Sequence, residues 1–136
     1  MILRSAHPRD VDGVLALWRR AEAEPSATDD PASLLRLFAS DPDGLLVAEE
    51  DGALVGTAMV VFDGWRANLY RLAVVPEHRR RGIARALVEE GERRARARGA
   101  RRFSAIVLAA EAPAVGFWEA AGYQPDPRVT RFTKTR

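Results

Sequence analysis

Apolar residues recur three and four positions apart in four parts of the chain, which is the spacing of one face of a helix. The first stretch begins at Asp10 and ends at Glu24-Pro25-Ser26, and the second follows Asp30-Pro31. The third spans Ile83–Arg98, and the fourth spans Pro113–Ala121. A glycine follows each of the last two, as is usual after a helix C-terminus. The pattern therefore predicts four amphipathic helices.

Short apolar runs lie beside these helices and predict strands. The predicted strands are Ile2–Ala6, Leu45–Glu49, Leu54–Phe62, Arg66–Val75, Phe103–Leu108 and Val129–Thr135. Asp-Gly pairs at 51–52 and 63–64 are typical of hairpin turns, so the strands between residues 45 and 75 should form an antiparallel meander. The fifth strand follows a long helix and is almost wholly apolar, which predicts a parallel pairing with the fourth. We expect a mixed α/β (α+β) sheet with helices on both faces, closed by the last strand.

The length and composition restrict the class of protein. The chain has 136 residues, 47% of them hydrophobic, which fits a single domain spanning residues 1–136. No apolar run reaches the roughly 18 residues of a membrane span, and Met1–Arg4 lacks the apolar segment of a signal peptide. We therefore expect a cytoplasmic protein with no membrane partner. The absence of cysteine excludes disulfides, thiolate metal sites and a cysteine nucleophile, and no metal site is predicted.

Opposite charges gather in two separate stretches of the sequence. Between Arg79 and Arg102, ten arginines stand against three glutamates, which gives a net charge of +7. Between Glu22 and Asp51, nine carboxylates stand against one arginine, which gives a net charge of −8. The basic stretch is suited to phosphates, and the acidic stretch is suited to cations.

The most informative segment is the junction of the fourth strand with the third helix, Leu72–Ala84. An apolar strand ends, three consecutive arginines follow, and a helix begins at Gly82. The first amides of a helix have no intrahelical partner and, with the helix dipole, favour an anion. Gly82 and Ala84 leave room for a ligand to approach the backbone. The segment has neither the P-loop pattern nor the glycine pattern of a Rossmann dinucleotide site.

The remaining motif, Arg79-x-x-Gly82-x-Ala84 after an apolar strand, resembles the acetyl-CoA motif of the GNAT superfamily of N-acetyltransferases. Later in the chain, Phe117-Trp118-Glu119-Ala120-Ala121-Gly122-Tyr123 looks like the family's Phe-Tyr-x-x-x-Gly-Phe element. The order of elements matches from residue 2 to 135, and the sequence is most similar to small single-domain YpeA-type bacterial members. The resemblance implies a GNAT-type mixed, mostly antiparallel six-to-seven-stranded sheet with helices on both faces and a central βαβ cofactor site.

The resemblance also implies a role for particular residues in binding acetyl-CoA. Main-chain amides would hold the pyrophosphate, and they belong to Arg79, Arg80, Arg81, Gly82, Ile83 and Ala84. The backbone of Leu72, Ala73 and Val74 would pair with the pantetheine between splayed fourth and fifth strands, and one of these amides would polarise the thioester carbonyl. Phe117 and Trp118 would pack against the pantetheine or acetyl end. The 3′-phosphate partner is left open among Arg80, Arg81 and Arg85.

The chain departs from the family at the usual catalytic positions. Trp118 stands where a tyrosine often serves as general acid, and Asn68 stands where a strand glutamate can serve as general base. Glu111 replaces an asparagine that contacts the pantetheine. Asn68 could orient a water, and Glu111 could act on the substrate amine or cap the fourth helix.

Tyr70 is the preferred replacement for the missing acid. Strand alternation predicts that it shares one face with Asn68, Leu72 and Val74, near the thioester. Tyr123 is the second candidate, although it matches a structural phenylalanine of the family. His78 is expected to be exposed.

These features predict an N-acetyltransferase that moves an acetyl group from acetyl-CoA to an amine of a small molecule or peptide, by direct attack in a ternary complex. The acidic stretch indicates a cationic acceptor. One alternative is a GNAT-like module that binds acyl-CoA without catalysis. A second is a nucleic-acid-binding domain that uses the Arg79–Arg102 cluster, although this cluster lacks the interleaved aromatic residues of single-strand binders, so no nucleic acid is expected. The acceptor, the acyl length and the choice between monomer and homodimer are left open.

Overall fold

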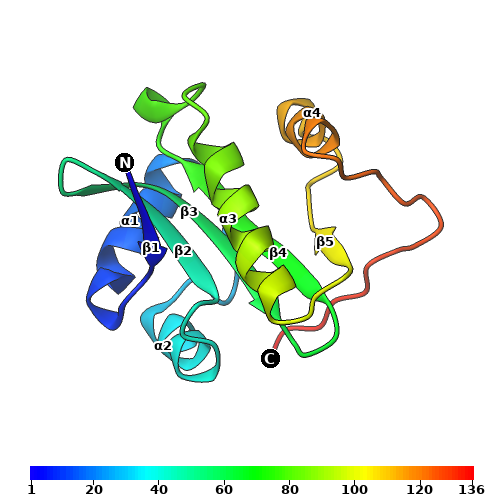
Figure 1. Ribbon diagram of the computed structural model, residues 1–136, viewed down its shortest axis with the longest axis horizontal. Helices are drawn as coiled ribbons and strands as arrows, with labels where there is room; N and C mark the ends of the chain where they lie inside the picture. Colours follow the sequence, from blue (N-terminus) through cyan, green and yellow to red (C-terminus); the bar gives the residue numbers. More distant parts are fainter.

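A computed structural model describes residues 1–136 and shows one five-stranded sheet with the order β1-β2-β3-β4-β5 (Figure 1). The strands are β1 (Ile2–Ser5), β2 (Leu45–Glu50), β3 (Ala53–Phe62), β4 (Ala67–Val74) and β5 (Phe103–Ala105). The helices are α1 (Val11–Arg20), α2 (Pro31–Ser40), α3 (Ile83–Ala97) and α4 (Ala112–Ala120), with short 3₁₀ turns η1 (Pro8–Asp10) and η2 (Pro76–His78). The first four strands pair antiparallel, and β5 pairs parallel to β4. The predicted helices, meander and βαβ unit are therefore confirmed.

Helices cover both faces of the sheet, as the sequence predicts. On one face, α3 crosses β3 so closely that a Cβ built on Gly91 would lie 2.4 Å from Val60 Cγ2 (Figure 1). On the other face, Trp18 of α1 donates from Nε1 to Thr57 Oγ1 at 2.9 Å. The two faces alternate along β3, since Gly56 contacts α3 while its neighbour Thr57 contacts α1.

Local side chains fix the start of α2, which follows the loop between α1 and α2 (residues 21–30, here called the acidic loop). Asp30 Oδ1 accepts a hydrogen bond from the Ser33 amide at 2.8 Å, which satisfies one of the free donors of the first turn of α2. Pro31 fills the first helical position, where no amide donor is needed. Asp30 and Pro31 therefore fix the position at which the loop ends and α2 begins.

The C-terminal part of the sheet is shorter than predicted. β5 ends at Ala105 rather than Leu108, and Val129–Thr135 forms no strand, so the sheet has five strands rather than six to seven. The chain beyond α4 runs as a coil that bows out past β5 and turns back, so that the C-terminus lies below α3 in this view (Figure 1). Val129 and Phe132, its two large apolar residues, would project from opposite faces of a strand, so no single face could bury both. No helix has the length and apolar content needed to cross a membrane.

Candidate functional site

The edge of β4 becomes open halfway along the strand. The parallel ladder pairs Ala67 with Phe103, Asn68 with Ser104 and Leu69 with Ala105, and it goes no further. From Tyr70 onward, β4 continues toward α3 with no strand on that side. The opening arises because β5 ends at Ala105, not because two continuing strands splay apart as predicted. It leaves a row of main-chain groups available for an extended ligand.

A bulge at Arg71 divides β4 into two parts. Thr57 pairs with Ala73 and Met59 pairs with Tyr70, so two residues of β4 oppose one residue of β3. Arg71 has a φ of 51°, in the left-handed region. No glycine or proline marks this position in the sequence, so the bulge could not be predicted.

The bulge overturns the prediction that Asn68, Tyr70, Leu72 and Val74 share one face. Val74 pairs with Gly56, which contacts α3, so Leu72 and Val74 face α3. Tyr70 pairs with Met59, the neighbour of the α3-facing Val60, so Asn68 and Tyr70 face α1 and α2 instead. The strand alternation is correct within each part, but the extra residue at the bulge reverses it between them.

The open edge presents the main chain of two particular residues. The Val75 amide donates to Val55 O at 3.0 Å, so residues 73 and 75 direct their main-chain groups toward β3. Leu72 and Val74 therefore direct theirs toward the open edge. Of these groups, Val74 O is already taken, because it accepts from Arg79 Nε at 3.1 Å.

The loop that leads from this edge into α3 has the form of an anion site. Arg80 and Gly82 have φ values of 64° and 80°, which turn successive amides toward one concave side. No side chain caps α3, and its first helical bond runs from the Ala86 amide to Gly82 O. The amides before Ala86 therefore lack intrahelical partners, at the positive end of a 15-residue helix. A Cβ built on Gly82 would meet nothing within 4 Å, so the space over the loop is open.

The arginines of this segment have different positions. Arg79 ties the loop to the body of the protein, since its Nη2 donates to Ala21 O at 3.1 Å in addition to the Val74 bond. Arg85 pairs with Glu89 at 3.0 Å on the outer side of α3. Arg80 and Arg81 are exposed and form no salt bridge. Of the three candidates for the 3′-phosphate, these two have side chains that are not already paired.

The aromatic residues near α4 form a packed group. Trp118 is buried, and its ring lies 4.9 Å from that of Tyr123 and 5.3 Å from that of Phe117, both edge to face. The Tyr123 hydroxyl donates to Glu92 Oε2 at 2.6 Å. Burial, together with the Glu92 carboxylate, raises the pKa of Tyr123 above its ordinary value. The Tyr123 hydroxyl thus holds α4 against α3. Contact of Phe117 and Trp118 with a pantetheine stays a prediction.

The remaining predicted residues lie as follows. Glu111 is exposed at the N-cap position of α4, and its side chain makes no capping hydrogen bond. His78 was expected to be exposed, and this is wrong, because η2 folds its ring back against the end of β2. His78 Nε2 lies 3.4 Å from Glu50 Oε2, and its Nδ1 is buried.

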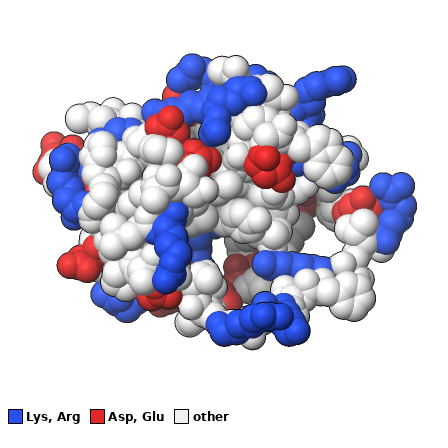
Figure 2. Space-filling view, turned by 90° about the horizontal axis from the view of Figure 1, so that it is seen from below, with Lys and Arg blue, Asp and Glu red and all other residues white.

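Two ion pairs join the basic and acidic stretches of the sequence. Arg98 pairs with Asp41 at 3.3 Å, and Arg94 lies 3.8 Å from Asp43. On the face shown in Figure 2, basic side chains gather along the upper edge, and acidic side chains are scattered in smaller groups. In the loop between α1 and α2, Glu22 and Glu24 keep carboxylates that form no salt bridge.

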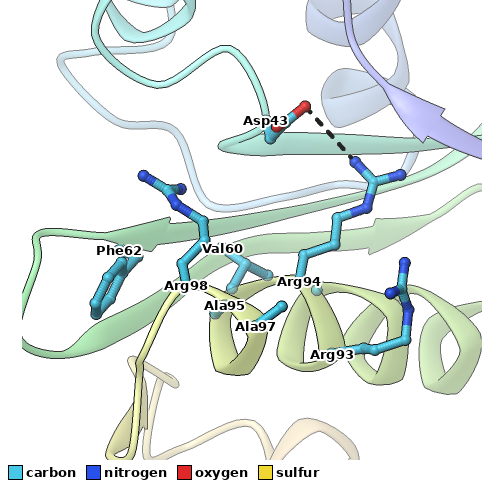
Figure 3. Close-up of a pocket in the computed structure, with 9 residues that line it drawn as sticks. Asp43, Val60, Phe62, Arg93, Arg94, Ala95, Ala97 and Arg98 are labelled. Carbon is cyan, nitrogen blue, oxygen red and sulfur yellow. Dashed lines mark ion pairs between the residues drawn. The ribbon is translucent and has the colours of Figure 1, made fainter.

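A pocket of about 220 Å³ lies at the other end of α3, away from Gly82 (Figure 3). It is lined by Arg93, Arg94 and Arg98 above Val60 and Phe62. All three arginines are paired with carboxylates, so the pocket offers an anion no free charge. No group of three or more His, Asp or Glu side chains in the structure could hold a metal ion.

Comparison with known proteins agrees with this geometry. The model of the acetyltransferase (GNAT) family matches residues 11–123. An acetyltransferase of Pectobacterium atrosepticum is 34% identical over 124 residues, which make up 91% of this chain and 88% of the relative. The chain therefore belongs to the GNAT family of acetyltransferases.

Solved structures share the fold. PaiA N-acetyltransferase from Thermoplasma acidophilum, in complex with coenzyme A, has a TM-score of 0.80 at 17% identity, over 92% of this chain and 90% of that chain. The aminoglycoside N-acetyltransferase AAC(6')-Iy, in complex with a bisubstrate analogue, has a TM-score of 0.75 at 20% identity, over 99% and 98% of the two chains.

Proposed function

We propose that this acetyltransferase uses acetyl-CoA and acetylates an amine, and that the open edge of β4 and the N-terminus of α3 bind the cofactor. The observation that carries the proposal is the continuity of these two features. The open main-chain groups of Leu72 and the amide of Val74 lead directly into an uncapped helix N-terminus beside Arg80 and Arg81. An extended arm with amide groups that ends in phosphates fits such a surface along its length.

The chain supplies binding and polarisation through its backbone. The amides that precede Ala86 would hold the pyrophosphate, as the family resemblance implies. The Leu72 amide, at the edge where the ladder with β5 has ended, is the candidate donor to the thioester carbonyl. Such a donor stabilises the negative charge that develops on the carbonyl oxygen during attack.

The reaction itself needs one proton transfer that the chain can assist. The neutral amine nitrogen forms a bond to the thioester carbonyl carbon, the carbon–sulfur bond breaks, and the amine loses a proton. The departing thiolate takes up a proton, for which Tyr70 is the candidate donor. Tyr70 and Asn68 face α1 and α2, the side where the acidic loop lies. Holding amine and thioester together provides the remainder of the acceleration.

The acceptor that this site favours is a cationic amine. Four of the nine carboxylates of the acidic stretch pair with arginines, whereas Glu22 and Glu24 form no salt bridge. Both belong to the loop between α1 and α2, on the side toward which Tyr70 points. Two free carboxylates would hold a second charged group of a polyamine, an aminoglycoside or a basic peptide. The fold match to an aminoglycoside N-acetyltransferase supports this acceptor class.

The test is release of the CoA thiol from acetyl-CoA with a panel of polyamines, aminoglycosides, basic peptides and neutral amines. We expect release that depends on a cationic amine, and mass spectrometry should find the acetyl group on its nitrogen. Preference for neutral or acidic amines would contradict the cationic acceptor alone. Thermal stabilisation by acetyl-CoA without turnover of any amine would instead favour a non-catalytic module, which the tryptophan at position 118 and Asn68 also suggest.

A further inference from the structure

The bulge residue Arg71 is held by the protein at both its main chain and its side chain. Its left-handed φ of 51° is a conformation that is unfavourable for a residue with a Cβ. Such a conformation persists only where surrounding contacts hold it in place. Those contacts come from β3 and α1 on one side and from the acidic loop on the other.

The main-chain contact fixes the direction of the next amide. Thr57 Oγ1 donates to Arg71 O at 2.8 Å and accepts from Trp18 Nε1 at 2.9 Å. The Thr57 side chain is fully buried. The carbonyl of Arg71 and the amide of Leu72 belong to one planar trans peptide, so they point in opposite directions. With the carbonyl held toward Thr57, the Leu72 N–H is held away from β3, toward the open edge.

The side-chain contact fixes the loop between α1 and α2. Arg71 Nη2 lies 2.6 Å from Asp29 Oδ1 and 2.5 Å from Oδ2, and Nη1 donates to Glu24 O at 2.8 Å. The guanidinium also lies 5.1 Å from the ring centroid of Trp18. The Arg71 and Asp29 side chains are only 16% and 21% exposed, so this pair is poorly screened by water. One arginine therefore holds two points of the loop that carries the free glutamates.

We propose that Arg71 is a positioning residue that sets the Leu72 amide and the acceptor loop together, with Thr57, Trp18 and Asp29 as its supports. This inference rests on the proposed function, because it assigns the amide to the thioester and the loop to the amine. An amine that settles into the loop acts on Arg71 through Asp29, and Arg71 carries the effect to the peptide that polarises the thioester. Acceptor binding and carbonyl polarisation are thereby coupled through one residue.

The first arm of the experiment compares Asp29→Asn with Asp30→Asn. Both remove one negative charge from adjacent positions, but Asp30 caps α2, which asparagine also does well. We expect Asp29→Asn to raise the KM for the acceptor and to lower kcat by about tenfold each, consistent with loss of a hydrogen-bonded charge pair. The dissociation constant for acetyl-CoA should stay unchanged. Equal kinetic constants for the two variants would contradict the coupling.

The second arm compares Thr57→Val with Thr57→Ser. Valine removes both hydrogen bonds of the hydroxyl, whereas serine keeps them, so we expect kcat to fall about tenfold in the first and to recover in the second. In the double variant Asp29→Asn/Thr57→Val, the two losses should be less than additive, because both act through Arg71. Additive losses would show that the loop and the bulge act independently.

The third arm needs no turnover, which separates this inference from the proposed function. Hydrogen exchange is followed at residues 21–30, with α3 amides as the reference for global stability. We expect Thr57→Val, but not Thr57→Ser, to speed exchange in the loop relative to α3. Unchanged relative exchange would overturn the coupling, even if amines are acetylated. Faster exchange in a protein that acetylates no amine would retain the mechanical link and refute the enzymatic role.

Discussion

The hydroxyls of the two tyrosines in this chain have different uses. The Tyr123 hydroxyl donates to Glu92, so it is already engaged, and burial together with that carboxylate raises its pKa. Tyr70 lies on β4, one residue before the bulge and on the face toward α1 and α2. Its position beside the open edge makes it the tyrosine to test as the general acid.

Substitution of Tyr70 by phenylalanine should lower kcat by about a hundredfold, the lower part of the range for general acid catalysis. The KM for acetyl-CoA should change little, because the backbone binds the cofactor. Tyr123→Phe is the control: it should lower the free energy of unfolding by about 1 kcal/mol and leave kcat unchanged. The measurement is CoA release with a cognate amine. Activity of Tyr70→Phe within about twofold of the wild type would remove Tyr70 from the acid role.

At the scale of elements, the contact of α3 with β3 depends on a helical glycine. A Cβ at Gly91 would lie 2.4 Å from Val60 Cγ2 and 3.1 Å from Val60 Cβ, well inside normal contact. Glycine is unfavourable inside a helix by about 1 kcal/mol relative to alanine. Gly91 therefore lowers the helix propensity of α3 but allows the helix to pack closely on β3. Since α3 also provides the uncapped amides, this contact sets where the proposed anion site lies relative to the sheet.

Gly91→Ala should therefore destabilise the protein by about 1–3 kcal/mol despite the better helix propensity of alanine. Gly116→Ala is the matched control in α4, where a Cβ would meet nothing within 4 Å. It should raise stability by up to about 1 kcal/mol. Urea unfolding measures both, and adding Val60→Ala should recover part of the loss. A stabilised Gly91→Ala variant would show that α3 can move off the sheet without cost.

Much of this element arrangement could be predicted from the sequence because each signal was local. Helical spacing predicted the helices, Asp-Gly pairs predicted the turns of the meander, and the apolar run after α3 predicted the parallel strand. The bulge could not be predicted, because Arg71 takes a left-handed conformation only through Thr57, Trp18 and Asp29, which are distant in the sequence. Prediction of the face of Tyr70 and Leu72 failed for the same reason. The candidate anion loop could be proposed from the sequence because its residues are consecutive.

At the scale of the whole molecule, a charged group near the N-terminus joins three elements. Arg4 of β1 donates to Asp10 Oδ2 at 2.8 Å and to Glu49 Oε1 at 3.0 Å, which ties β1 to η1 and β2. The Arg4 guanidinium, and then the His7 amide, hold the pKa of Asp10 below its ordinary value. A carboxyl group of this kind stabilises the fold above its ordinary pKa of about 4, and the effect is lost as the pH falls through the lowered value.

Asp10→Asn should accordingly lower the free energy of unfolding by about 2 kcal/mol near neutral pH. The difference from the wild type should shrink as the pH falls below about 4, because protonation of Asp10 then weakens the wild type as well. Denaturant unfolding at a series of pH values measures this. Asp51→Asn, in an exposed turn with no salt bridge, should differ little from the wild type at any pH. A difference for Asp10→Asn that stays constant with pH would contradict the assignment.

The central claim, that the loop before α3 binds the phosphates of acetyl-CoA, is tested most directly by calorimetric titration of acetyl-CoA into two glycine variants. Gly82 and Gly99 lie at opposite ends of α3, both have positive φ, and an added Cβ would meet nothing within 4 Å at either position. Alanine therefore introduces backbone strain at each position, and more at Gly99, whose φ of 112° lies further from the left-handed region than the 80° of Gly82. We predict that Gly82→Ala weakens acetyl-CoA binding by about tenfold or more, because its methyl group enters the space over the amides, while Gly99→Ala binds like the wild type. Equal affinities in the two variants would contradict the account.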